Sequence, residues 1–476
     1  METDKDSFSK VGKLILTLCS LGQFLVVLDA SIVNIALPSF RQEFDMSGDS
    51  LQWLINIYTI LFAALLLVGG VLSDAFGSRK VLLAGSLIFG TVSLLAGFSQ
   101  NETTLIIFRA LQGASAGLIA PSTLSIIAST FAGNGSLRGK AFGIWGATAS
   151  AGGAAGVIFG GVITQWLSWH WVFWVNVPLV VVLLFLIWKV PMGGNERSGN
   201  ILLALRSVGV VVIAAFALVV LIYSALLLSS GDTKVAYGLI GFVIAVVLIA
   251  MFWVIQTRLK NPVIPPALFK SSSVVLGNVT ALVSSGSIFA TYYFLTLQMQ
   301  ESLGFSPIEI GLSYLPMTVL MFFSARLAGG FLSAKMGGYV TNCLGLLVAG
   351  IGLLLLALAS LFHSSNLLIV IMATLLLGIG QGIITTSSSM LATTGIDWKF
   401  YGIASGLVNT SRQVGGALLL GSIVAVVSGA HGDKMFESYS AYSLAFFLAA
   451  VSPILLSVAA FIMKARFSSS KANQAN

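Results

Sequence analysis

The amino-acid sequence predicts an all-α integral membrane protein in which two bundles of six helices are joined through two further helices. Three observations lead to this prediction: the composition, the recurrence of long apolar runs, and a repeat that relates the two ends of the chain. Of 476 residues, 57% are hydrophobic and 8% are charged, and the mean hydropathy is +0.99. A soluble chain of this length could not cover its surface with so few polar groups. The lipid bilayer is therefore the expected environment.

Apolar runs of about 20 residues follow one another along the chain, and this is the length that carries a helix across the hydrocarbon of a bilayer. Fourteen spans are expected, near residues 13–36, 52–72, 81–98, 104–127, 140–165, 170–189, 203–228, 235–257, 274–298, 309–332, 340–362, 366–390, 401–428 and 440–463. The first run is long enough to span and lacks a small-residue cleavage site, so we expect it to be the first span and not a signal peptide.

The distribution of positive charge orients these spans. Of the 24 basic residues, 18 fall on the side that holds both termini, three fall on the other side, and three lie within spans. The positive-inside rule assigns the richer side to the cytosol. We therefore expect a multi-pass protein of the cell membrane with both termini cytoplasmic. The net charge of +8 reflects this topology, and no basic stripe with interleaved aromatic residues indicates a nucleic-acid partner.

A repeat relates the first and last thirds of the chain. Gly69–Gly77 matches Gly329–Gly337 at an offset of 260 positions, and glycine-rich segments beginning at Gly113 and Gly139 match Gly378 and Gly402 at offsets of 265 and 263. Paired halves of this kind in a membrane protein are typical of transporters. The offset exceeds the length of six spans by roughly 70 residues. The expected division is therefore an N-terminal six-helix bundle (1–190), a linker with two inserted transmembrane helices (191–265) and a C-terminal six-helix bundle (266–476).

Several motifs connect the chain with a known family. They are Leu28–Pro38 in the first span, Gly70–Lys80 after the second, Arg109–Gly113 in the fourth, Trp169–Pro178 at the start of the sixth, and Gly402–Gly416 in the thirteenth. With these motifs the chain resembles the fourteen-span drug:proton antiporters of the major facilitator superfamily, over almost its whole length. The resemblance implies the major facilitator fold and multidrug efflux by alternating access. It also implies that a proton is the coupling ion and that no other cofactor is needed.

The fifth span departs from the pattern of that family, which usually has Gly-Pro where this chain has Gly156-Val157. The proline kink is lost, which weakens the antiport interpretation without selecting another mode. Small residues remain at Gly152, Gly156, Gly160 and Gly161. Because small residues four positions apart let helix backbones approach closely, we expect these glycines to pack against a neighbouring helix.

The loop after the second span carries a candidate conformational latch. Its members are Gly70, Asp74, Gly77, Arg79 and Lys80. Asp74 can face the N-terminus of a neighbouring helix, and Arg79 and Lys80 can pair across the interface between the two bundles, which would hold one conformation. The alternative is an ordinary positively charged cytosolic loop.

Asp29 is the one acidic residue well inside a predicted span, and an intramembrane carboxylate is a functional candidate because its burial is costly. It lies about 10 Å from the outer end of its span, and Arg109 lies about 8 Å from the outer end of the fourth. At matched depth the two can meet, since the resemblance places both spans around one cavity. A carboxylate beside an arginine stays ionised, whereas a desolvated carboxylate without a partner takes up a proton. The pair is thus a candidate proton-coupling device, and a static ion pair is the alternative.

Arg412 lies about 16 Å into the thirteenth span, where a cation needs a cavity or a counter-ion. The candidate cavity and substrate residues are Asn34, Gln112, Asn409, Arg412, Gln413, Tyr292 and Tyr293. One carboxylate set against one or two guanidinium groups favours amphipathic substrates that are neutral, zwitterionic or anionic. Aromatic residues at such positions are more often packing groups or lipid-facing groups, which is the alternative for the two tyrosines.

The leading functional prediction is a secondary active transporter that exports small amphipathic drugs or metabolites in exchange for protons. A lipid or fatty-acid exporter of the same fold and a non-transporting membrane sensor are the alternatives. No cluster of acids, histidines or a nucleophilic cysteine indicates an enzyme. Cys19 and Cys343 have no metal-ligand spacing, and no metal is expected. A monomer is the expected state.

Overall fold

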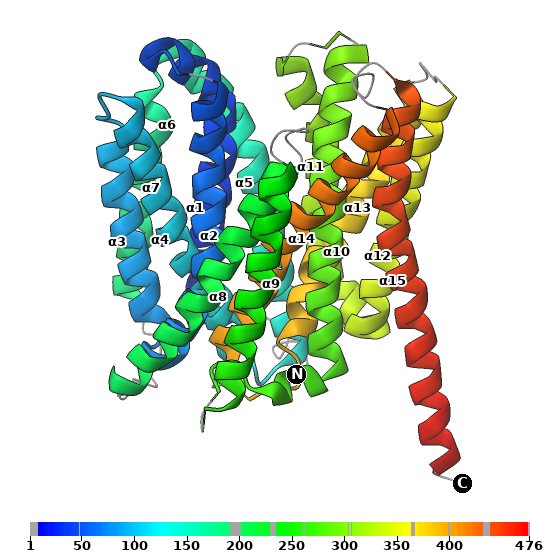
Figure 1. Ribbon diagram of the computed structural model, residues 1–476. Helices are drawn as coiled ribbons and strands as arrows, with labels where there is room; N and C mark the ends of the chain where they lie inside the picture. Colours follow the sequence, from blue (N-terminus) through cyan, green and yellow to red (C-terminus); the bar gives the residue numbers. More distant parts are fainter. Residues whose placement is uncertain are drawn as a thin grey trace.

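The computed structural model describes residues 8–46, 48–190, 201–228, 235–259, 262–302, 304–305, 307–362, 367–397, 400–431 and 438–474. Regular structure in these residues is entirely helical (Figure 1). The first group comprises α1 (Lys10–Phe44), α2 (Gly48–Phe76), α3 (Ser78–Ala96), α4 (Glu102–Thr130), α5 (Gly135–Trp166), α6 (His170–Trp174) and α7 (Asn176–Lys189). Then come α8 (Ile201–Leu228) and α9 (Val235–Thr257). The last group comprises α10 (Ser272–Leu297), α11 (Pro307–Leu327), α12 (Ser333–Leu361), α13 (Leu367–Ala392), α14 (Tyr401–His431) and α15 (Tyr439–Gln474).

Twelve helical segments in the described residues are long and apolar enough to cross a membrane. One of them, residues 309–361, contains the non-helical residue Gly337 (φ 78°, ψ 151°) and therefore holds two helices. The described apolar part of α8, Gly209–Ser224, is shorter. The described chain thus has about twelve to fourteen apolar helices, as an all-α membrane protein of this length requires.

The first and last groups of helices pack in the same pattern. α1 packs on α5, α2 on α4, and α3 on both α4 and α7; in the same way α10 packs on α14, α11 on α13, and α12 on both α13 and α15. The matched glycines occupy equivalent places, because Gly113 lies against the backbone of Tyr58 in α2 and Gly378 against that of Met317 in α11. Gly77 and Gly337 both adopt a positive φ, of 90° and 78°. The sequence repeat is therefore a structural repeat.

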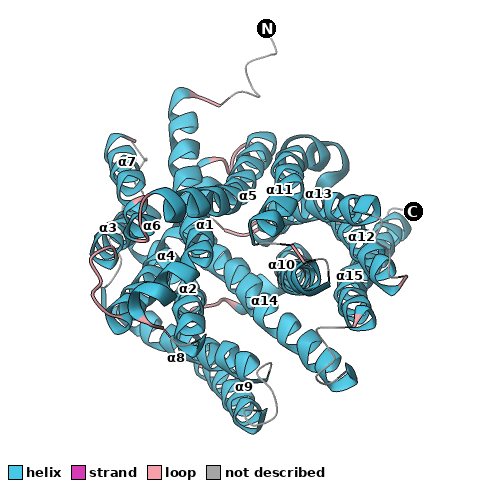
Figure 2. Cartoon of the chain, turned by 90° about the horizontal axis from the view of Figure 1, so that it is seen from above, coloured by secondary structure: helices cyan, strands magenta, loops and turns pink. Residues whose placement is uncertain are grey.

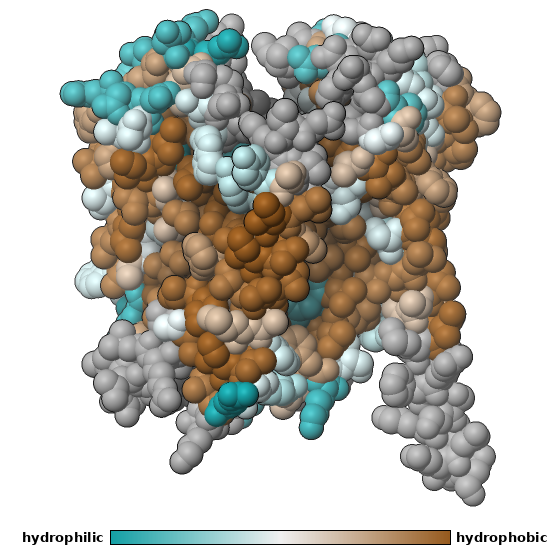
Figure 3. Space-filling view, viewed as in Figure 1, coloured by the Kyte–Doolittle hydropathy of each residue, from teal (hydrophilic) through white to brown (hydrophobic). Residues whose placement is uncertain are grey.

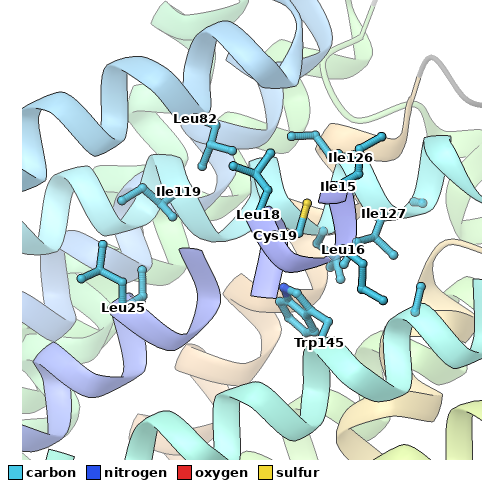
Figure 4. Close-up of a cluster of buried hydrophobic side chains, with 14 of the residues drawn as sticks. Ile15, Leu16, Leu18, Cys19, Leu25, Leu82, Ile119, Ile126, Ile127 and Trp145 are labelled. Carbon is cyan, nitrogen blue, oxygen red and sulfur yellow. The ribbon is translucent and has the colours of Figure 1, made fainter. Parts of the chain in front are cut away.

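Apolar side chains fill the interior of the first half. Figure 4 shows Ile15, Leu18 and Cys19 of α1 packed against Ile126 and Ile127 of α4, in a buried cluster that also takes in residues of α3 and α5. Both cysteines, at 19 and 343, are buried and free, as expected for small apolar core residues.

The inserted helices α8 and α9 lie at the outer edge of the molecule (Figure 2). α8 packs on α2 and α14, and α9 packs chiefly on α8. Most large apolar side chains of α9 are exposed, Val243 and Val247 among them. Their surface belongs to the brown apolar belt that crosses the face shown in Figure 3. The insert is therefore peripheral, and α9 is a lipid-facing helix.

The two halves contact each other at the end of the molecule where both chain termini lie (Figure 1). Gly70 of α2 packs against Gly402 of α14, and Gly139 of α5 packs against Gly329 just after α11. Glycines are needed at these crossings because a Cβ on Gly70 would lie 2.5 Å from the carbonyl oxygen of Gly402.

The glycines of α5 divide into two sets. A Cβ on Gly152 would lie 2.8 Å from the carbonyl oxygen of Phe24, and one on Gly156 would lie 2.9 Å from that of Leu28, so both hold α5 close to α1. Gly160 is buried. The expectation for Gly161 is wrong, because a Cβ there would meet no atom within 4 Å. One residue beyond Gly160, it is turned by about 100° to another side of the helix.

We expect Gly156→Val to separate α1 from α5 and to lower the free energy of unfolding by about 1–3 kcal/mol, the usual cost of overpacking. Gly161→Val is the matched control, since the same side chain there enters open space. Thermal unfolding of both variants in detergent would check the difference. Equal stability of the two variants would contradict the packing described for Gly156.

Candidate functional site

A buried ion pair lies in the first half. The Nη1 atom of Arg109 in α4 donates to Oδ2 of Asp29 in α1 at 2.7 Å. Asp29 is 0% exposed and Arg109 is 1% exposed. The residues meet, as their matched depths predicted, because α1 and α4 pack together. A carboxylate sealed from water in this way is stable only while it is paired and hydrogen-bonded.

Two uncharged residues form hydrogen bonds to this pair, and a third, Ser93, bonds to one of them. Asn176 of α7 donates through Nδ2 to Oδ1 of Asp29 at 2.7 Å. Gln112 donates through Nε2 to the same oxygen at 3.2 Å and to Ser93 of α3 at 2.8 Å, while its Oε1 accepts from Arg109 at 2.9 Å. The proposal of Gln112 as a substrate ligand needs correction, because its side chain is fully buried and committed to this network.

Tyr58 of α2 covers the guanidinium of Arg109, whose carbon lies 4.2 Å from the ring centroid. The Tyr58 hydroxyl donates to the carbonyl oxygen of Val26 at 3.2 Å, which fixes the ring. Residues of five helices therefore form one polar cluster, which we call the Asp29 network. Its members are Asp29, Arg109, Gln112, Tyr58, Ser93 and Asn176. Sequence reasoning missed Tyr58, Ser93 and Asn176 as members of it, although Asn176 lies in one of the motifs.

The Asp29 network holds a charge that is shielded on all sides in this conformation. The Nε of Arg109 and the Oδ1 of Asn176 are buried without a hydrogen-bond partner in the described residues. Such atoms are uncommon in native interiors, where most buried polar groups have a hydrogen-bond partner. Any movement of α1 against α4 or α7 would change the hydrogen-bond partners of Asp29.

Asp74 joins the two halves at the end that holds the termini. Its two carboxylate oxygens accept from the backbone N–H groups of Gly402, at 2.8 Å, and Ile403, at 2.7 Å. These are free donors of the first turn of α14, where a negative charge is stabilised by the helix dipole. The Asp74 carboxylate thus lies at the N-terminus of a helix of the other half, as the sequence led us to expect.

The expectation that Arg79 pairs across the interface is wrong. Its Nη2 donates to the carbonyl oxygen of Ile187 at 2.7 Å, at the C-terminal end of α7 in the same half. A cation is stabilised there by the unpaired carbonyls of the helix end. Lys80 is exposed at the start of α3, and Gly77 supplies the positive φ of 90° that the turn before α3 requires.

Arg138, which sequence reasoning did not single out, makes a second connection between the halves. Its Nη2 donates to the carbonyl oxygen of Thr393 at the end of α13 at 2.6 Å. Its guanidinium also lies 5.2 Å from the ring centroid of Tyr401 at the start of α14. Asp74 and Arg138 together therefore hold both sides of the connection between α13 and α14.

Arg412 is bonded to neutral groups. Its Nη1 donates to Oδ1 of Asn409 at 3.0 Å, and its Nη2 donates to Ser389 Oγ at 2.6 Å, to the carbonyl oxygen of Thr385 at 3.1 Å and to Ser388 Oγ at 3.2 Å. It reaches from α14 to α13, two helices that make little other contact. Among the residues that the structure describes, no carboxylate lies within ion-pair distance of it.

The remaining candidates lie apart from these groups. Gln413 is partly buried beside Arg412, and the side chain of Asn34 lies outside the described part of the chain. Tyr292 stacks edge-on against Tyr314 at 5.1 Å, beside the apolar core of the second half, and Tyr293 is exposed. Both tyrosine positions match those of packing or lipid-facing groups.

Comparison with known proteins places the chain among transporters. The family described as "Major Facilitator Superfamily" matches residues 19–201 and 201–420. The chain belongs to the major facilitator superfamily. It is 34% identical over 460 residues to the cephamycin export protein of Amycolatopsis lactamdurans, covering 96% of this chain and 93% of that one. It is 34% identical over 414 residues to the puromycin resistance protein of Streptomyces alboniger, covering 86% and 80%.

Solved structures agree with this assignment at the level of the fold. The human organic anion transporter MFSD10 superimposes with a TM-score of 0.65 at 16% identity, covering 94% of this chain and 99% of that one. The proton:xylose symporter XylE superimposes with a TM-score of 0.66 at 14% identity, covering 94% of each chain. The protein is therefore a multi-pass membrane transporter of the major facilitator fold and not an enzyme.

Proposed function

We propose that this transporter exports small amphipathic molecules in exchange for protons, and that Asp29 and Arg109 carry the coupling. The observation that supports the proposal is the ion pair at 2.7 Å, fully buried in the half that holds α1 and α4. An intramembrane carboxylate of this kind marks proton relays in transporters. Similarity to proteins named for the export of cephamycin and for resistance to puromycin supports export as the direction.

In this proposal the shielded state and a second, opened state of the Asp29 network alternate. While Arg109 donates to the carboxylate, Asp29 stays ionised. When the halves rotate, α1 shifts against α4 and α7, the carboxylate loses donors, and it binds a proton. Substrate and proton then compete for the same protein conformations, which is how coupling arises from alternating access. The proton is the coupling ion, and no other cofactor takes part.

The proposed latch is formed by the Asp74 carboxylate on α14, together with the Arg138 contact and the glycine crossings at Gly70 and Gly139. It keeps one end of the transporter closed. We assign that end to the cytosol because the positive charge of the loops is concentrated there. The transporter is proposed to work as a monomer with fourteen spans, in which residues 1–190 and 266–476 form the moving bundles and 191–265 form the inserted pair.

Transport in proteoliposomes with an imposed pH gradient tests the function directly. The full-length protein would be offered lipophilic compounds of each charge sign, with fatty acids and lysophospholipids as a separate set. Accumulation of drug-like amphipaths that depends on the gradient supports the proposal. Movement of lipids alone, or movement that a pH gradient does not alter, would contradict it.

We expect Asp74→Ala to loosen the closed end. It removes two hydrogen bonds to a charged group at a helix N-terminus, each contact of this type being worth about 0.5–2 kcal/mol, so the opened population should rise by roughly tenfold. Electron–electron distances between spin labels at Gly133 and Lys335, one in each half, would report the change. Asp74→Asn should give an opened population between those of the unmodified protein and Asp74→Ala, because one acceptor oxygen remains. Unchanged distances in Asp74→Ala would exclude the latch.

Cysteine labelling tests the proposed orientation of the chain in the membrane. In a chain with Cys19 and Cys343 replaced by alanine, a thiol reagent that does not cross membranes should label a cysteine at Gly429 in intact cells. It should label a cysteine at Ser468 only after permeabilisation. The opposite pattern would overturn the assignment of both termini to the cytosol and with it the count of fourteen spans.

A further inference from the structure

The two arginines within α4 and α14, Arg109 and Arg412, have different electrostatic surroundings. Arg109 is neutralised by Asp29 within its own half. Arg412 has neutral partners throughout the part of the chain that the structure describes. A guanidinium in the middle of a membrane is costly without a negative partner. Serine, threonine and asparagine oxygens solvate the charge but do not cancel it, so the site is incomplete until an anion is present.

Arg412 lies close to the interface between the two halves. It lies eleven residues after Tyr401, the first residue of α14, or about 16 Å from the closed end at the helical rise. This is farther along α14 than the residues that contact Asp74 and Gly70. The residues that it reaches on α13 are next to the first half, because Thr385 lies near Gly146 of α5.

The donor geometry leaves capacity for an anion. A guanidinium has five N–H donors, and the bonds of Arg412 use Nη1 once and Nη2 for three acceptors. Its Nε has no hydrogen-bond acceptor among the described residues. Gln413 lies four residues after Asn409, on the same face of α14.

We propose that Arg412 binds a carboxylate carried by the exported molecule, and that Asn409, Ser388 and Ser389 hold the guanidinium in place for it. This inference rests on the export function proposed above and names its substrate class: apolar molecules with one carboxylate group. Arginine suits this role because its planar group recognises a carboxylate through directed, charge-assisted hydrogen bonds.

A matched pair of fluorescent probes tests the proposal. Dansylglycine and dansylglycinamide differ only in a carboxylate against a neutral amide. Binding of each to the purified full-length protein in lipid nanodiscs would be measured at equilibrium, without a pH gradient. We expect dansylglycine to bind roughly tenfold to a hundredfold more tightly, the ratio that a hydrogen bond to a charged group provides. Added chloride should compete weakly, since it lacks the shape of a carboxylate.

Variants test whether Arg412 is the residue that causes the preference for dansylglycine. Arg412→Gln should remove it, Arg412→Lys should keep part of it because the charge remains without the planar fork, and Arg326→Gln should leave it intact. Arg326 is the matched control, since it is an exposed arginine in the same half. Equal binding of the two probes to the unmodified protein would overturn the proposal even if Arg412→Gln fails to fold. So would the absence of saturable binding, displacement of dansylglycine by dilute chloride, or a preference that survives in Arg412→Gln.

These outcomes are separate from those of the export proposal. A protein that exports neutral amphipaths with a pH gradient but shows no preference between the probes would keep the proposed function and lose the carboxylate site. A protein that prefers dansylglycine but shows no gradient-driven transport would keep the site and lose proton coupling.

Discussion

Asp29→Asn is expected to abolish substrate export driven by a pH gradient while leaving exchange of substrate down its own gradient. Asparagine has the size of aspartate but cannot take up and release the coupling proton. The network can adapt to it, because the amide of Asn176 has an oxygen without a partner in the described residues and can turn to accept from the new amide group. Proteoliposome assays with and without the pH gradient would separate the two modes.

The control for this prediction is Ser93→Ala, which touches the same network at its edge through Gln112 and leaves the titratable group unchanged. It should retain gradient-driven export. Full proton-driven export by Asp29→Asn would show that the coupling carboxylate lies elsewhere or that the transporter is not coupled to protons. Loss of both transport modes in Asp29→Asn would instead assign Asp29 a structural role.

The pairing of Asp29 with Arg109 could be predicted because depth in a membrane follows from residue number in a straight helix. Charged residues within spans are also rare enough to be noticed. The rest of the network could not be predicted in the same way. Asn176 and Ser93 are uncharged residues of a kind common in transmembrane helices, and a sequence does not specify which side of α3 or α7 faces α1.

The incorrect prediction for Arg79 also depends on tertiary packing. Arg79 binds the end of α7 in its own half, and nothing in the loop sequence states where that helix ends in space. Gly161 is different, since helical geometry alone places it about 100° away from Gly160, and a stricter use of that angle would have excluded it from the packing face. The repeat was predicted correctly because both halves preserve glycines where backbones cross, and a close crossing tolerates few other residues.

Arg109→Ala is expected to lower the stability of the folded transporter by about 3–5 kcal/mol, the cost of leaving a buried charge without its partner. The Asp29 carboxylate would keep hydrogen bonds from Gln112 and Asn176 but would lose its only described counter-ion, and Tyr58 would lose the cation that lies 4.2 Å from its ring centroid. Unfolding of the purified protein in detergent would measure the loss.

A double-mutant cycle makes this prediction specific to the ion pair. Asp29→Asn alone should destabilise the protein less than Arg109→Ala, because the free amide oxygen of Asn176 can accept from the new side chain although Arg109 loses its counter-ion. The double variant Asp29→Asn with Arg109→Gln replaces both charges by amides and should be less destabilised than either single variant. Arg326→Gln, which removes an exposed arginine, should change stability by less than about 0.5 kcal/mol. If the two single effects simply add in the double variant, then Asp29 and Arg109 do not stabilise the fold as a pair, and the energetic basis for coupling through them is absent.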